Sequence, residues 1–157
     1  MASWRELVEA EPAFAAQVRT VFDRHRHKTI TTLRRDGSPR ISGIEAQIVG
    51  DDLWFGGMPD SRKIRDLLRD PRFALHSGSD DPPGWTGDAK VAGEAVYVTD
   101  PKQIAALAAT TGEGPGPASY FRADLQEVVL TCLGEPADHL LIESWHVGRG
   151  LERNMRR

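Results

Sequence analysis

The chain of 157 residues contains a single cysteine, so no disulfide can form within it. Its cysteine and histidines do not recur at the spacing of a zinc site, and we expect no bound metal. No stretch approaches the roughly 20 consecutive apolar residues that cross a bilayer. The N-terminus lacks the basic stretch and apolar run of a secretory signal. A net charge of −3 argues against general nucleic-acid binding.

These absences favour a cytoplasmic protein that binds neither membranes nor nucleic acids. A length of 157 residues is typical of one folding unit. We therefore expect a single domain over residues 1–157, with a helical segment at 1–25 and a C-terminal tail at 147–157. The basic residues are mainly arginine (16 Arg and 4 Lys), which suits planar recognition of anions but also fits a GC-rich genome.

Residues 1–25 carry two helical patterns. Ser3 and Glu6 form a capping-box pattern that opens a short helix, and Pro12 interrupts it. Because proline is well accommodated at the first helical position, a second helix is predicted from Pro12 to about Arg24. Its apolar side chains recur at helical spacing and form one buried face, namely Phe14, Val18, Val21 and Phe22.

After this segment the hydrophobic period changes from helical to alternating. Residues 28–34 are rich in β-branched side chains and precede Asp36-Gly37, which is a strong hairpin signal. In the next strand, 40–49, one face is shared by Ser42, Ile44, Ala46 and Ile48. Shorter strands are predicted at 53–55, 73–76, 90–98, 125–133 and 140–145.

The remaining segments are helices and loops. A helix is predicted after Asp60 or Ser61, with an inward stripe of Ile64, Leu67 and Leu68. Another runs from Pro101 to about Ala109, and residues 77–87 and 111–117 are predicted to be irregular. Strands joined by tight turns exclude a parallel sheet, which needs a crossover at each connection. We therefore predict a mainly β fold with inserted helices, built as an antiparallel barrel.

The segment 55–73, FGGMPDSRKIRDLLRDPRF, is informative about function. Arg62 and Lys63 fall in the first turn of the predicted helix, where the helix dipole disfavours cations unless an anion binds beside them. Free backbone N–H groups together with Arg and Lys form a typical phosphate site. Gly56 and Gly57 would let a ligand approach the backbone closely. A solvated basic helix end is the alternative.

Arg40 and Ser42 share strand parity with the apolar face that includes Ile44. They extend the core-facing side beyond its apolar part, as a polar pair at a pocket mouth does. Fraying of the strand, with both side chains in water, is the alternative interpretation.

Two ordered segments carry a family resemblance. The first is the hairpin TTLRRDGSPRIS at 31–42, and the second runs from Ser61-Arg62-Lys63 through Leu67 to Asp70-Pro71-Arg72. Together they resemble the opening hairpin, the phosphate-binding helix and the following strand of pyridoxamine 5′-phosphate oxidase-like split barrels. The similarity runs from about residue 24 to residue 98, with a looser fit of the later strands.

The resemblance implies an FMN-binding split β-barrel that acts as a homodimer, with two cofactor sites along the dimer interface. Carried over by position, Arg62 and Lys63 would bind the cofactor phosphate. The other cofactor contacts that the resemblance implies in this part of the chain are Arg40, Ile41, Ser42, Gly56 and Gly57.

The C-terminal part departs from the family pattern. Residues 143–149, ESWHVGR, are similar to the family's segment of Trp and Arg residues, but the later spacing is shorter. The resemblance therefore does not extend to pyridoxamine phosphate as the substrate. It implies that Trp145 would stack on the cofactor ring or close the pocket, and that Arg149 would meet an anionic substrate. Trp85, in its own loop, is a further candidate for closing the pocket against substrate. Packing of the tryptophans and solvent exposure of Arg149 are the alternatives.

The short relatives that this resemblance implies include enzymes that use 8-hydroxy-5-deazaflavin in place of FMN, and both cofactors carry a phosphate. The cofactor would supply the hydride chemistry, so no dedicated acid–base pair is expected. We predict an oxidoreductase that acts on a small organic molecule. The alternative is a non-catalytic binder or sensor of flavin, deazaflavin or tetrapyrrole on the same barrel.

Overall fold

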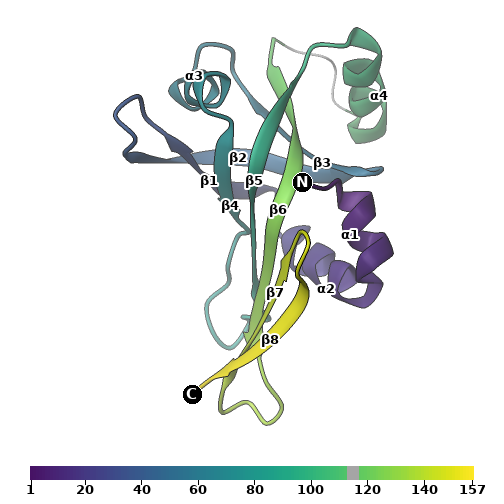
Figure 1. Ribbon diagram of the computed structural model, residues 1–157, viewed down its shortest axis with the longest axis vertical. Helices are drawn as coiled ribbons and strands as arrows, with labels where there is room; N and C mark the ends of the chain where they lie inside the picture. Colours follow the sequence, from purple (N-terminus) through teal and green to yellow (C-terminus); the bar gives the residue numbers. More distant parts are fainter. Residues whose placement is uncertain (113–116) are drawn as a thin grey trace.

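The computed structural model describes residues 1–112 and 117–157, which form eight strands and four helices (Figure 1). In chain order they are α1 (Trp4–Ala10), α2 (Pro12–Phe22), β1 (His27–Leu33), β2 (Pro39–Val49), β3 (Asp52–Gly57), α3 (Arg62–Arg69), β4 (Arg72–His76), β5 (Asp88–Val98), α4 (Pro101–Thr111), β6 (Ser119–Leu133), β7 (Leu140–His146) and β8 (Gly150–Arg156). Of the predicted irregular segment 111–117, residues 113–116 lie outside the described residues. No helix formed by the described residues is long and apolar enough to span a membrane.

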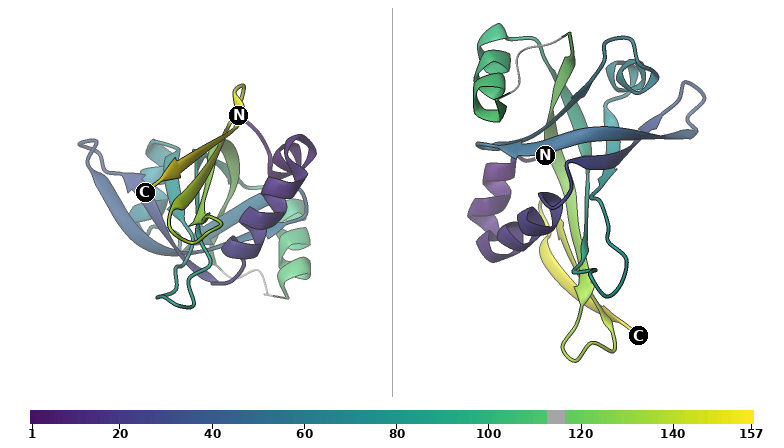
Figure 2. Two further views of the ribbon diagram at one scale, coloured as in Figure 1. Left: turned by 90° about the horizontal axis from the view of Figure 1, so that it is seen from below. Right: turned by 180° about the vertical axis from the view of Figure 1, so that it is seen from behind.

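Six strands close into an antiparallel barrel in the order β1-β2-β3-β6-β5-β4, and β4 returns to β1. The barrel can close because β6 is long enough to pair with two strands, β3 and β7, along the same edge. Its residues 119–122 pair with β3, and its residues 127–133 pair with β7. The β7–β8 hairpin therefore extends away from the barrel (Figures 1 and 2). The predicted antiparallel split β-barrel is confirmed.

Strand β8 corrects the prediction of a C-terminal tail at 147–157. It pairs with β7 along its whole length, from Gly150 opposite His146 to Arg156 opposite Leu140. Its residues from Glu152 onward are all exposed, so the strand shows no alternation of buried and exposed positions there. Charged side chains on such an edge strand discourage pairing with other chains.

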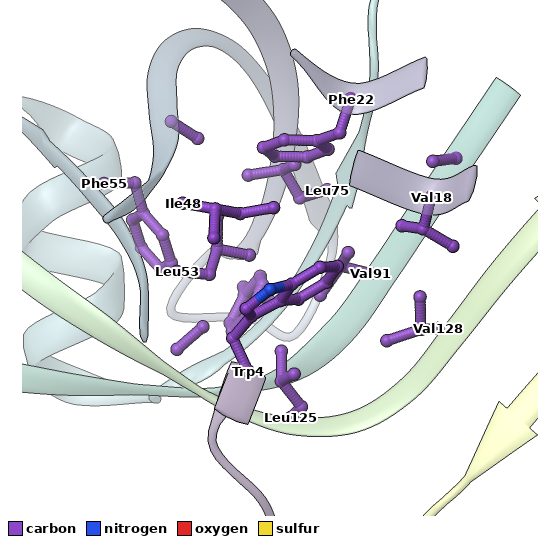
Figure 3. Packing of buried hydrophobic residues seen from close by; sticks show 14 of the residues in the cluster. Trp4, Val18, Phe22, Ile48, Leu53, Phe55, Leu75, Val91, Leu125 and Val128 are labelled. Carbon is purple, nitrogen blue, oxygen red and sulfur yellow. The ribbon is translucent and has the colours of Figure 1, made fainter. Parts of the chain in front are cut away.

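The N-terminal helices pack against β3, β5 and β6. Ser3 forms the predicted capping box, because its Oγ accepts the Glu6 N–H at 3.2 Å and its own N–H donates to Glu6 Oε2 at 2.7 Å. The predicted face of α2 is buried at Phe14, Val18, Val21 and Phe22. Trp4 and Phe22 meet strand residues such as Leu53 and Val91 in one core (Figure 3).

The β1–β2 hairpin determines which face of β2 points into the barrel. It turns where predicted, at Asp36-Gly37, and Gly37 has a φ of 85°, which suits glycine. Inside the barrel, β2 buries Ile44, Ala46 and Ile48, as predicted from their alternation. Gly43 and Glu45 point outward and are exposed. The two faces of this strand have different roles.

Helix α3 connects β3 to β4 and packs against β1. Ile64 and Leu67 are buried as predicted, but Leu68 is 54% exposed. Asp66 is buried instead, at 3% exposure. The inward stripe therefore includes a carboxylate, which is stable there because three hydrogen-bond donors reach it.

Candidate functional site

A cavity of about 490 Å³ lies on the outer surface of the barrel, between the start of α3 and helix α4. The two helices lie at the same end of the molecule (Figure 1). Strands β2, β3 and the beginning of β6 form the floor of the cavity. Its lining includes Gly43, Glu45, Gln47, Trp54, Leu107 and Tyr120.

The strand register places one row of residues across this floor. Glu45 lies opposite Gly56, and Gly56 lies opposite Tyr120. Since side chains alternate along a strand, Gly43 shares the outward face with Glu45, and Trp54 shares it with Gly56. Gly56 leaves the middle of the row without a side chain. The floor is therefore flat at its centre, with a carboxylate on one side and an aromatic ring on the other.

Helix α3 begins at the edge of the cavity. Asp60 has a φ of 69° and leads into the extended N-cap residue Ser61. The Ser61 Oγ is buried, and it has no hydrogen-bond partner among the described residues. By contrast, the N-cap side chains of Ser3 and Asp100 each accept a backbone N–H. The first N–H groups of a helix also lack acceptors within it, so the start of α3 offers several donors to an anion.

Two glycines fit β3 closely to its neighbours. Lys63 Nζ donates to Gly43 O at 3.0 Å, which brings the ammonium group to the cavity wall. A Cβ at Gly57 would lie 2.9 Å from Lys63 Cε, and a Cβ at Gly56 would lie 2.6 Å from Ser119 O. The glycine pair therefore allows close packing of the chain on itself, whereas the sequence predicts only close approach of a ligand.

The first turn of α3 carries two cations and no acid. Arg62 is exposed and Lys63 is half-buried. Within residues 1–112 and 117–157, neither side chain forms an ion pair. Because the positive end of the helix dipole disfavours both cations, an anion bound beside them would stabilise this end of the helix.

Arg40 lies on the inner side of β2, away from the cavity. Its Nε donates to Asp66 Oδ2 at 2.7 Å, while Thr32 Oγ1 and Arg69 Nη2 donate to the same carboxylate at 2.8 and 3.2 Å. Burial alone would raise the pKa of Asp66, but these hydrogen bonds outweigh it and hold the pKa below its usual range. The network ties α3 to β1 and β2 and so positions the start of the helix.

Three of the eight predicted cofactor residues line the cavity: Gly56, Gly57 and Lys63. The structure does not bring the other five to its wall, and these are Arg40, Ile41, Ser42, Arg62 and Trp145. Trp145 is only 6% exposed and packs in the core, so ring stacking by it has no support in this geometry. The binding roles of all eight residues remain predictions.

The two predicted substrate residues also lie away from the cavity wall. Trp85 is in the β4–β5 loop, where its Nε1 donates to Asp88 Oδ1 at 3.1 Å. Arg149 lies in the exposed turn between β7 and β8, and its N–H donates to His146 O at 3.1 Å. Their contacts with substrate remain predictions.

Several lining residues are not predicted from the sequence: Glu45, Gln47, Trp54, Leu107 and Tyr120. Strand parity could have found Trp54, which lies two residues from Gly56 and so shares its face. Tyr120 is hidden from such reasoning because β6 begins at Ser119, whereas the pattern predicts a strand only from residue 125. Leu107 depends on where α4 lies against the barrel.

The closed antiparallel barrel, its β7–β8 hairpin and the cationic helix end define a split-barrel protein with a candidate anion site on its outer surface. A comparison with models of protein families matches residues 14–132 to the family described as pyridoxamine 5′-phosphate oxidase. The chain belongs to this family, which confirms the resemblance found in its sequence. No curated protein matches the chain in a sequence comparison.

Solved structures share this fold at low sequence identity. A heme binding protein from Mycobacterium smegmatis is 15% identical, with a TM-score of 0.63, and the match covers 93% of this chain and 88% of that one. PhzG from Burkholderia lata is 15% identical, with a TM-score of 0.59 and coverage of 97% and 91%. An F420 reductase is 18% identical, with a TM-score of 0.54 and coverage of 70% and 94%. At such identities the likeness shows the fold alone.

Proposed function

We propose that the chain binds FMN or 8-hydroxy-5-deazaflavin in the outer cavity and acts as an oxidoreductase on a small organic molecule. The start of α3 carries this proposal, because the buried Ser61 Oγ has no partner among the described residues and two cations stand beside it. A phosphate would accept from the hydroxyl and from the first N–H groups of the helix. It would also offset the charges of Arg62 and Lys63.

The remaining lining suits a planar ring. Trp54, Leu107 and Tyr120 form an apolar part of the wall, and Gly56 places no side chain on the floor beside them. When bound, the cofactor supplies the hydride chemistry. The side chains of this protein would hold the phosphate at α3, orient the ring over the floor and exclude water from one of its faces. The F420 reductase among the structural neighbours makes a deazaflavin a natural ligand to test.

We further propose that the protein is a homodimer with the cofactor at the interface. Ile41 on β2 and Met58 after β3 are 74% and 76% exposed, and Met58 also lines the cavity. A second copy that covers these apolar side chains would close the open side of the site. Sedimentation of the purified protein measures its mass, and a monomer at micromolar concentration would contradict the dimer.

Titration of the purified protein with FMN, and separately with the deazaflavin, tests the cofactor site. The double variant Arg62→Ala, Lys63→Ala should weaken binding by roughly 100-fold, since two charge-assisted contacts to phosphate are lost. The matched control removes two exposed arginines from the far end of the chain, Arg156→Ala and Arg157→Ala, and should bind as the wild type does.

The outcomes separate the possible functions. Unchanged affinity in the Arg62→Ala, Lys63→Ala protein would refute the phosphate site, and binding of neither cofactor would refute the proposal. Binding followed by turnover with a reductant and an acceptor supports an oxidoreductase. Binding without any turnover would instead support a binder or sensor on the same barrel.

A further inference from the structure

The described lining of the cavity contains one acidic side chain, Glu45. Arg26 pairs with it, since Arg26 Nε lies 3.2 Å from Glu45 Oε2, and His27 Nδ1 lies 3.9 Å from its Oε1. The Glu45 side chain is 43% exposed, so its charge faces the cavity and is only partly screened by water. A carboxylate fixed in this way places a negative charge at a defined point of the wall.

The position of Glu45 relative to the start of α3 follows from the strand. Lys63 Nζ donates to Gly43 O, and Glu45 is two residues further along the same face of β2, a distance of about 7 Å. A Cβ at Gly43 would meet nothing within 4 Å, so the floor between them is open. A ligand whose phosphate binds at Lys63 would lie along β2. Its ring, which a polar chain joins to the phosphate, would then reach Glu45.

The register determines which edge of a ring would face this carboxylate. Glu45, Gly56 and Tyr120 form one row, so a ring over Gly56 would lie between a carboxylate and a tyrosine. Leu107 adds to the apolar side of the cavity. The hydrogen-bonding edge of the ring would therefore turn toward Glu45, because a carboxylate accepts hydrogen bonds and an apolar wall does not.

We propose that Glu45 is a specificity-determining residue, and that its carboxylate disfavours a ring system that carries negative charge. This inference rests on the proposed function. The ring of oxidised FMN is neutral and offers an N–H donor at its polar edge, whereas the ring of reduced FMN ionises to an anion. Like charges a few ångströms apart in a partly buried site repel each other. Glu45 therefore shifts the balance of affinities toward oxidised FMN.

The test measures the dissociation constant of oxidised FMN and the midpoint potential of the bound cofactor at a pH where the reduced ring is ionised. The difference between this potential and that of free FMN gives the ratio of the affinities for the reduced and oxidised forms, and the dissociation constant then gives each affinity. Glu45→Gln keeps the shape of the side chain and removes its charge, and should raise this ratio by about threefold to tenfold. Glu9→Gln is the matched control, since Glu9 also pairs with an arginine but lies on α1, and it should leave the ratio unchanged.

A second measurement uses the unmodified protein. If the effect is electrostatic, raising the ionic strength should move the wild-type ratio toward that of Glu45→Gln. Bound FMN with the same ratio in both proteins would overturn the role of Glu45 and leave the proposed function standing. Weaker binding of both forms in equal measure would show that Glu45 acts only as a neutral acceptor, which also overturns the inference. Failure of the wild type to bind either form of FMN would overturn the inference, and failure to bind the deazaflavin as well would also overturn the proposed function.

Discussion

Replacing Ser61 by alanine separates two roles of an N-cap hydroxyl. Removing a serine that caps a helix costs about 1 kcal/mol, because a capping hydrogen bond is lost. Ser61 makes no capping bond, so in the cofactor-free protein the free energy of unfolding should change by less than about 0.5 kcal/mol. Ser3 is the matched control, since its Oγ accepts the Glu6 N–H. Ser3→Ala should cost about 1 kcal/mol, or roughly 2–4 °C in the melting midpoint.

The same Ser61→Ala variant should bind a phosphate-bearing cofactor more weakly. A hydrogen bond to a charged group contributes about 1.5–3 kcal/mol, so the dissociation constant for FMN should rise about 10- to 150-fold. Urea denaturation followed by tryptophan fluorescence measures the effect on stability, and FMN titration measures the effect on binding. A stability loss equal to that of Ser3→Ala would refute the reasoning that this hydroxyl is left for a ligand, as would an unchanged dissociation constant.

Three other predictions concern the residues around the site. Asp66→Asn should destabilise the protein by about 3 kcal/mol in urea denaturation, because the buried carboxylate accepts from three donors. Folding lowers the pKa of Asp66, so its contribution is complete above the unfolded pKa of about 3.9 and is lost as the pH falls through the folded pKa. Acid titration of stability should therefore be steeper in the wild type than in Asp66→Asn. Gly56→Ala should cost about 1–3 kcal/mol because its Cβ meets backbone at Ser119, whereas Gly57→Ala should displace only Lys63 and weaken FMN binding. Equal melting midpoints for the two alanine variants would contradict this difference.

Much of the fold is predictable because its signals are local. The Ser3–Glu6 capping box, the turn at Asp36-Gly37 and the alternation through Ile44 each involve residues close together in the chain. Strand β8 is not predictable in this way. An edge strand with exposed side chains on both faces has no hydrophobic alternation, and only its pairing with β7 defines it. Likewise, the burial of Asp66 in place of Leu68 is not predictable from neighbouring residues. It depends on hydrogen-bond donors from β1 and β2, which are far away in the sequence.

The candidate site is predictable only where one segment builds it. The cations at the start of α3 and the glycines before them lie within a few residues of one another, and Lys63 reaches the cavity wall. Strand alternation correctly predicts that Arg40 points inward, but it does not predict what Arg40 contacts. Its side chain donates to Asp66, 26 residues away, and does not reach the site. Tyr120 enters the floor only because β6 closes the barrel against β3, a pairing between strands far apart in the chain.

The two faces of β2 are under different structural constraints. Ile44, Ala46 and Ile48 face the core, so changes there disturb the packing that closes the barrel. Gly43 and Glu45 face the cavity and contribute nothing to that core, so they can change without loss of the fold. The charge of Glu45 can therefore vary independently of the packing that closes the barrel.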